Sequence, residues 1–97
     1  MTFEQIINEP TPTLVDFFAT WCGPCKAMMP ALETLKTEMG DQIRIIKIDV
    51  DKNTDLAVAQ KVMGVPTLAL FKNGKELWRQ AGVMTAPGLK EVVLKYS

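Results

Sequence analysis

The hydrophobic pattern of the first half of the chain predicts two strands separated by a long helix. Residues 13–19 (TLVDFFA) are a short, almost unbroken apolar run, which is typical of a strand buried on both faces, and residues 42–50 (QIRIIKIDV) are interpreted as a second buried strand. From Pro24 onward, apolar residues recur at helical spacing, and Gly40 is suited to the left-handed conformation that ends a helix. The stripe of this helix consists of Met28, Leu32, Leu35 and Met39.

Two shorter helices are indicated by their capping residues. Thr2 and Gln5 have the spacing of a capping box, in which each side chain accepts a free backbone N–H at the start of a helix. Two prolines then end this first helix. Asn53 caps another helix, which Gly64 ends. The apolar residues of that helix are Leu56, Ala59, Val62 and Met63.

The second half of the chain predicts a hairpin and a final helix. Two strands, 67–71 (TLALF) and 76–81 (ELWRQA), are predicted to be joined through Asn73-Gly74, a pair that accepts the positive φ angles of a type I′ turn. The last helix starts at Thr85, with a proline in its first turn. Its buried residues are expected to be Leu89, Val92, Val93 and Tyr96.

The order of these elements is a helix followed by β-α-β-α-β-β-α. A right-handed crossover through the long helix makes the first two strands parallel, and the hairpin adds antiparallel strands. We therefore expect an α/β fold with a mixed four-stranded central sheet and helices on both faces. At 97 residues the chain is long enough for one domain, residues 1–97, and too short for two.

Composition and charge exclude several classes of function. Eleven basic and eleven acidic residues cancel, so the chain has no basic field for nucleic acid or an anionic membrane. The start, MTFEQIINEP, lacks the features of a secretory signal. No apolar run approaches the roughly 18 residues of a membrane span. We therefore expect a cytoplasmic protein.

The only two cysteines lie together in Ala19–Lys26 (ATWCGPCK), in a chain without histidine. Cys22 falls just before the predicted helix and Cys25 in its first turn, so their Cβ atoms lie about 5–6 Å apart. Free N–H groups and the positive end of the helix favour a thiolate on Cys22. Lys26 adds a nearby positive charge of small effect, because its side chain is exposed.

Three uses of these thiols can be compared. A loop closed by two intervening residues removes little entropy from the unfolded chain, which argues against a structural disulfide. Two cysteines and no histidine cannot complete a zinc site in one chain without carboxylates, although a dimer could supply four thiolates to zinc or an iron–sulfur cluster. Redox use of the pair is favoured, and a metal-bridged dimer and inert thiols remain as alternatives.

The run WCGPCK after VDFFA, followed by VPT, KNG and a later glycine, resembles the thioredoxin family over nearly the whole chain. The resemblance implies a thioredoxin fold and a thiol–disulfide oxidoreductase that reduces protein disulfides, with a part in electron transport and cell redox homeostasis. Cys22, exposed, attacks the partner disulfide, and Cys25, more buried, resolves the mixed disulfide. Gly23 and Pro24 between them resemble those of the reducing members.

The resemblance also implies partners and further site residues. It implies a monomer without metal or cofactor that receives its electrons from a thioredoxin reductase. Asp16 matches a buried aspartate that accepts the proton of Cys25, and Lys47 matches a lysine that approaches this aspartate. From the pattern alone, Asp16 could equally lie at the surface at a strand end and Lys47 could face solvent.

The expected substrate surface surrounds the two cysteines. The resemblance implies that Pro66 follows a cis peptide bond and that a substrate chain pairs with the backbone of Val65. Trp21 is expected to form an exposed apolar rim. Gly82 and Val83 match the rest of this rim, where the missing side chain of glycine leaves room for a partner.

The chain departs from the family pattern at two points. Phe18 stands where the family usually has tryptophan, which alters packing near the site. The usual first strand is missing, so one edge of the sheet should be less protected. A thioredoxin fold can also serve as a redox-inert binding module or as a subunit of another enzyme. Such a non-catalytic function is the alternative to the hypothesis of an oxidoreductase.

Overall fold

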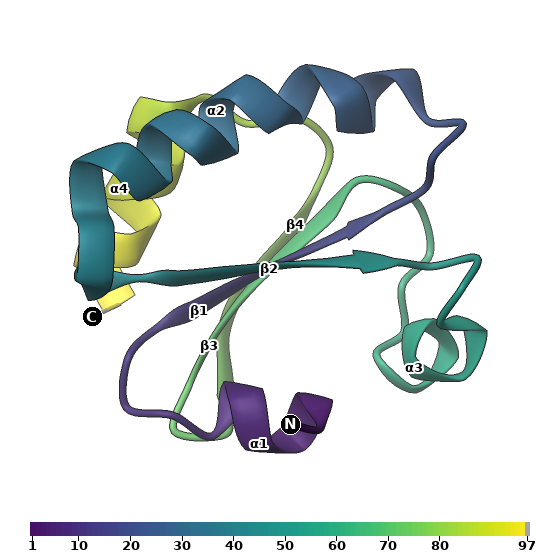
Figure 1. The fold of residues 1–97 in the computed structure, drawn as a ribbon, viewed down its shortest axis with the longest axis horizontal. Helices are drawn as coiled ribbons and strands as arrows, with labels where there is room; N and C mark the ends of the chain where they lie inside the picture. Colours follow the sequence, from purple (N-terminus) through teal and green to yellow (C-terminus); the bar gives the residue numbers. More distant parts are fainter. Residues whose placement is uncertain (97) are drawn as a thin grey trace.

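Helices and strands alternate along residues 1–96, the part of the chain that the computed structural model describes (Figure 1). The helices and strands have these bounds: α1 Phe3–Ile7, β1 Thr13–Phe18, α2 Gly23–Met39, β2 Arg44–Asp49, α3 Thr54–Ala59, β3 Thr67–Lys72, β4 Lys75–Ala81 and α4 Ala86–Tyr96. A short 3-10 helix, Gly40–Gln42, connects α2 to β2. The predicted order of elements is confirmed.

The four strands form one mixed sheet in the order β2-β1-β3-β4. β1 and β2 are parallel, whereas β3 is antiparallel to both β1 and β4. The β3–β4 hairpin turns through Asn73 and Gly74, whose φ angles are 53° and 81°. Both central turn residues therefore have the positive φ that the Asn-Gly pair predicts.

Helices cover both faces of the sheet, with α2 and α4 on one face and α1 and α3 on the other (Figure 1). β1 contributes to the core on both sides, because successive side chains of a strand point to opposite faces. Leu14 packs in the cluster of α2 and α4, whereas Val15 and Phe17 pack in the cluster of Phe3 from α1. All three β1 side chains are fully buried, as the apolar run predicts.

The helix termini and helix faces follow the sequence closely in three of the four helices. The capping box of Thr2 and Gln5 is present, and the predicted stripe of α2 is buried. Gly40 follows α2 with a φ of 54°. In α4, the Oγ1 atom of Thr85 accepts a hydrogen bond from the Gly88 N–H, and Leu89 is buried.

The prediction for the helix after Asn53 is wrong in its extent. α3 ends at Ala59, and Lys61 beyond it adopts a φ of 56°, so the helix stops before Gly64. Ala59, the last residue of α3, is exposed, and Met63, which lies beyond the end of the helix, is 95% exposed. Asn53 stands at the N-cap but its side chain makes no capping hydrogen bond.

β2 is an edge strand, so the expectation that residues 42–50 are buried on both faces is also wrong. Of its residues only Ile48 is buried, and Lys47 is exposed. The Arg44 N–H donates to the Pro12 carbonyl of the chain entering β1, at 2.9 Å. Because strand residues alternate in direction, Ile45 and Lys47 direct their backbone groups away from β1, where no other strand of residues 1–96 lies.

This open edge predicts a pattern of amide hydrogen exchange. In dilute protein, the amides of Ile45 and Lys47 should exchange at least about tenfold faster than those of Ile46 and Ile48, which bond to β1. Exchange followed by NMR, residue by residue, measures this difference. Equal protection along β2 at low protein concentration would contradict an open edge.

Candidate active site

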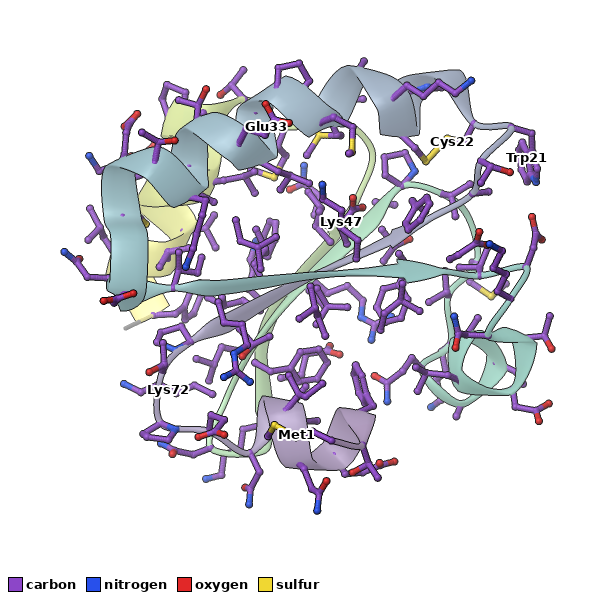
Figure 2. The ribbon with its side chains drawn as sticks, viewed as in Figure 1. Met1, Trp21, Cys22, Glu33, Lys47 and Lys72 are labelled. Carbon is purple, nitrogen blue, oxygen red and sulfur yellow. A yellow bond between two sulfur atoms is a disulfide. The ribbon has the colours of Figure 1, made fainter. Side chains whose placement is uncertain are left out.

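The two cysteines lie where β1 leads into α2, at one end of the sheet (Figure 2). β1 ends at Phe18, and Cys22 is the N-cap residue of α2, with the extended φ and ψ angles of −87° and 112° that this position requires. Cys25 follows in the first turn, and the two Cα atoms are 5.3 Å apart. The structure joins the two residues by a disulfide bond, with no free cysteine among the described residues.

The sulfur of Cys22 acts as the cap of α2. The backbone N–H of Cys25 donates a hydrogen bond to the Cys22 Sγ atom at 3.1 Å. This bond directs one of the free N–H groups at the start of α2, together with the positive end of the helix dipole, toward the sulfur. The same environment stabilises negative charge on Cys22 once the disulfide is reduced.

The expected contrast in exposure between the two cysteines is not present. Cys22 is 4% exposed and Cys25 is 3% exposed. Cys22 is covered because its Sγ lies 3.7 Å from the carbonyl oxygen of Val65 and packs with Ala19. In the disulfide form, position at the helix N-cap distinguishes Cys22 from Cys25, and surface exposure does not.

Asp16 is fully buried in the middle of β1, and neither of its carboxyl oxygens has a hydrogen-bond partner among residues 1–96. Like Leu14, it points to the face covered by α2, the helix that carries Cys25. Burial raises the pKa of the Asp16 carboxyl from 3.8 to about 6, and the positive charge of Lys47 partly offsets this effect. This pKa gives Asp16 the properties of a base near neutral pH.

Lys47 lies beside Asp16 on the neighbouring strand. The two residues are partners in the register of β1 and β2, and so they point to the same face of the sheet. Figure 2 shows the Lys47 side chain between β2 and α2. The structure therefore shows where both residues lie. Asp16 is not at the surface, whereas Lys47 is exposed yet close enough to lower the pKa of Asp16.

The loop before β3 and the end of β4 meet beside the disulfide. The Val65–Pro66 peptide bond is cis, as the resemblance implied. The Gly82 N–H donates to the Pro66 carbonyl at 2.9 Å, and Gly82 has a φ of 100°, which strongly favours glycine. Val83, the next residue, is 53% exposed. The structure thus brings Val65, Pro66 and Gly82 to the site predicted for them.

Trp21 is 71% exposed and points away from the molecule beside Cys22 (Figure 2). Its indole Nε1–H donates to the Asp51 Oδ2 atom at 2.8 Å, which fixes the ring at the rim. Sequence reasoning missed Asp51, because nothing in the pattern marks an exposed aspartate after β2 as a partner of Trp21. It also missed exposed Met63, which lines a cleft of about 240 Å³ with Trp21 and Val65.

Residues 1–96 contain neither a metal-binding cluster nor a membrane-spanning helix. Within residues 1–96, no group of three or more histidine, cysteine, aspartate or glutamate residues could hold a metal ion. In the same residues, no helix has both the length and the apolar character to cross a membrane.

Gly23 and Pro24, the two residues between the cysteines, are exposed.

The sequence and the fold of this chain are both similar to those of known proteins. Residues 1–95 match the family model described as Thioredoxin. The thioredoxin of Bacillus subtilis (strain 168) is 46% identical over 83 residues, which are 86% of this chain and 80% of that protein. The crystal structure of mitochondrial thioredoxin 3 from Saccharomyces cerevisiae (oxidised form) superimposes with a TM-score of 0.86 at 34% identity, covering 96% of this chain and 86% of that chain.

Some similar proteins are much longer than this chain. Thioredoxin X, chloroplastic, of Arabidopsis thaliana is 47% identical over 90 residues, which are 91% of this chain but 50% of that protein. The bifunctional thioredoxin reductase/thioredoxin of Mycobacterium leprae (strain TN) is 41% identical over 80 residues, which are 82% of this chain and 18% of that protein. The match therefore concerns one part of each longer protein.

The buried carboxyl of Asp16 predicts how stability depends on pH. Since its pKa in the folded protein is about 6, above the 3.8 of the unfolded chain, folding favours the protonated form. The contribution of Asp16 to the free energy of unfolding should be greatest below pH 4, fall by about 2 kcal/mol between pH 4 and 6, and stay low above pH 6.

Denaturant unfolding of the oxidised wild type and of Asp16→Asn, across pH 4 to 7, isolates this contribution. Asp16→Asn lacks the ionising group, so its advantage over the wild type should grow as the pH rises to about 6. All other carboxyl groups are the same in the two proteins and cancel in the difference. A difference that is independent of pH would contradict the raised pKa.

Proposed function

The chain belongs to the thioredoxin family, and from this we propose that it reduces disulfides of other proteins by exchange at Cys22 and Cys25 and is recharged by a thioredoxin reductase. That the chain is a thiol–disulfide oxidoreductase follows from its family and from the disulfide between these residues. The observation that carries the proposal is the sulfur of Cys22 at the N-cap of α2, with Cys25 in the first turn.

The reaction proceeds in two exchange steps. The Cys22 thiolate attacks one sulfur of a substrate disulfide, a mixed disulfide forms, and the other substrate sulfur leaves as a thiolate. The deprotonated Cys25 sulfur then attacks the Cys22 sulfur, which releases the second substrate thiolate and forms the Cys22–Cys25 disulfide. Two electrons pass to the substrate, and the protein ends in the disulfide state of this structure.

Asp16 accepts the proton of Cys25 before the second step. Its place on the α2 face of β1 and its pKa of about 6 support this role, because a base must be largely ionised at neutral pH. Lys47 keeps the pKa of Asp16 from rising further. Gly23 and Pro24 space the two cysteines at the start of α2.

Substrate proteins bind on the surface around the disulfide. An extended substrate segment pairs with the backbone of Val65, beside Pro66 and within reach of Cys22. Trp21 provides apolar contact area on one side, and Gly82 and Val83 complete the rim. The open space above Gly82, where an added Cβ would meet no atom within 4 Å, supports close approach of a substrate backbone.

The oxidised protein needs two electrons to begin again, and we propose that a thioredoxin reductase supplies them. The fusion of the two activities in the Mycobacterium leprae relative supports this pairing. The protein takes part in electron transport and redox homeostasis as a cytoplasmic monomer, and residues 1–97 act as one domain. It needs no metal or cofactor of its own, since both electrons are carried by the cysteine pair.

Substitution of the cysteines tests the order of attack. Cys22→Ser should reduce the rate of insulin reduction by dithiothreitol to the uncatalysed rate, because no attacking sulfur remains. Cys25→Ser should form the mixed disulfide and stall, so partner proteins stay bound to Cys22 until a reductant is added. Non-reducing gel electrophoresis with mass spectrometry detects them. If wild type and Cys22→Ser gave equal rates of insulin reduction, the hypothesis of an enzyme would be excluded and a redox-inert binding module would be favoured.

The pH dependence of the second exchange step tests Asp16. In Asp16→Asn, release of substrate from the mixed disulfide should be at least about tenfold slower than in wild type at pH 7. The difference should shrink as the pH rises, because hydroxide then takes over the removal of the proton. Rapid-quench measurement of the mixed disulfide gives both rates, and an equal rate at pH 7 would remove Asp16 from the mechanism.

A further inference from the structure

A second hollow adjoins the disulfide, apart from the cleft of Trp21 and Val65. It has a volume of about 240 Å³ and an almost wholly apolar surface. It shares no lining residue with that cleft. We call it the Phe18 cavity; the end of β1 and the first two turns of α2 form it, and its lining residues are Phe18, Ala19, Thr20, Cys25, Lys26 and Met29.

The residues of this cavity explain why it is open. Cys25 and Met29 lie four positions apart on α2 and so line the same side of the helix. Ala19 and Thr20 are small, and Phe18 is smaller than the tryptophan that the resemblance leads one to expect at its position. Met29 is 37% exposed at the mouth, whereas Cys25 is buried at the base.

The volume restricts what can bind. A cavity of about 150 Å³ lined by Leu, Ile and Phe is large enough for benzene, whereas pockets for drug-sized ligands begin at roughly 300 Å³. At about 240 Å³, the Phe18 cavity fits one aromatic or branched aliphatic side chain and is too small for a whole cofactor. Lys26 is the only charged lining residue, so a basic side chain would be disfavoured.

The position of the cavity points to the source of that side chain. Cys25 lines it, and the Cys25 sulfur is bonded to the sulfur of Cys22. A group in the cavity therefore lies next to Cys25, and the sulfur of Cys22, which does not line the cavity, is one bond away from the Cys25 sulfur. The residue adjoining the attacked cysteine of a substrate necessarily comes close to these atoms during the reaction.

We propose that the Phe18 cavity binds the aromatic or branched aliphatic side chain beside the disulfide-bonded cysteine of a substrate protein. This inference rests on the proposed function and adds a preference to it. Binding of that side chain favours attack on disulfides with large apolar neighbours. Phe18 and Met29 determine this preference. Phe18 leaves a volume that a larger tryptophan would fill, and Met29 makes the opening of the cavity apolar.

A pair of matched disulfides tests the preference. The substrates are the symmetric disulfides of blocked Cys-Phe and Cys-Gly dipeptides, reacted with pre-reduced protein. The wild type should reduce the Cys-Phe disulfide at least about tenfold faster, by second-order rate constant, than the Cys-Gly disulfide. The readout is the ratio of the two rate constants, so a general loss of activity does not affect it.

Three variants complete the experiment. Phe18→Trp fills the cavity and Met29→Gln makes its mouth polar, so each should lower the ratio toward one; Met29 is exposed enough for its variant to fold. Val58→Gln, at an apolar residue of α3 that is 77% exposed and lies outside the cavity, should leave both rate constants unchanged.

The outcomes separate this inference from the proposed function. A wild-type ratio near one, or a ratio that neither Phe18→Trp nor Met29→Gln lowers, would overturn the role of the cavity while insulin reduction stands. Failure of the wild type to reduce insulin and both dipeptide disulfides would overturn the proposed function itself.

Discussion

The hydrogen bond from the Cys25 N–H to the Cys22 sulfur is the contact on which the site depends. An N-cap side chain is commonly Ser, Thr, Asp or Asn, whose oxygen accepts such a bond. Here a sulfur takes that place, so the residue that caps α2 is also the residue proposed to attack the substrate disulfide. The fold supports this arrangement from both sides, because β1 is held in the core at Leu14 and Phe17 and α2 at Met28. The sulfur of Cys22 is thereby attached to two elements whose side chains are buried in the core.

Features with a local cause could be predicted from the sequence. The capping box of Thr2, the stripe of α2 and the Asn73-Gly74 turn each follow from residues close in the chain, and all three are confirmed. Features that depend on distant neighbours could not. The exposure of β2 follows from its place at the edge of the sheet that residues 1–96 form, and the cover over Cys22 comes from Val65, 43 positions away. The pattern also left Asp16 undecided, and only the resemblance pointed to its burial.

Asp16 shows the conflict between stability and chemistry in this chain. A carboxyl without hydrogen-bond partners, buried in the middle of β1, disfavours the folded state as soon as it ionises. An apolar residue at this position would pack the α2 face without that cost. The proposed role of Asp16 as the base for Cys25 accounts for this cost, since a site that needs a base close to a buried sulfur has to accept a destabilising residue there. Perturbed pKa values are common at functional sites, and the pKa of Asp16 is raised on the face of β1 that α2, the helix of Cys25, covers.

The open side of β2 bears on whether two copies of the chain would join their sheets. Its free backbone groups centre on Lys47, so antiparallel pairing of two such edges about that residue would bring the lysines of both copies opposite each other. Like charges in that position oppose pairing, and lysine on an outer strand is a common means of keeping sheets apart. Lys47, which limits the rise in the pKa of Asp16, therefore also opposes the addition of a further strand to the sheet, and replacing this lysine would disturb both effects.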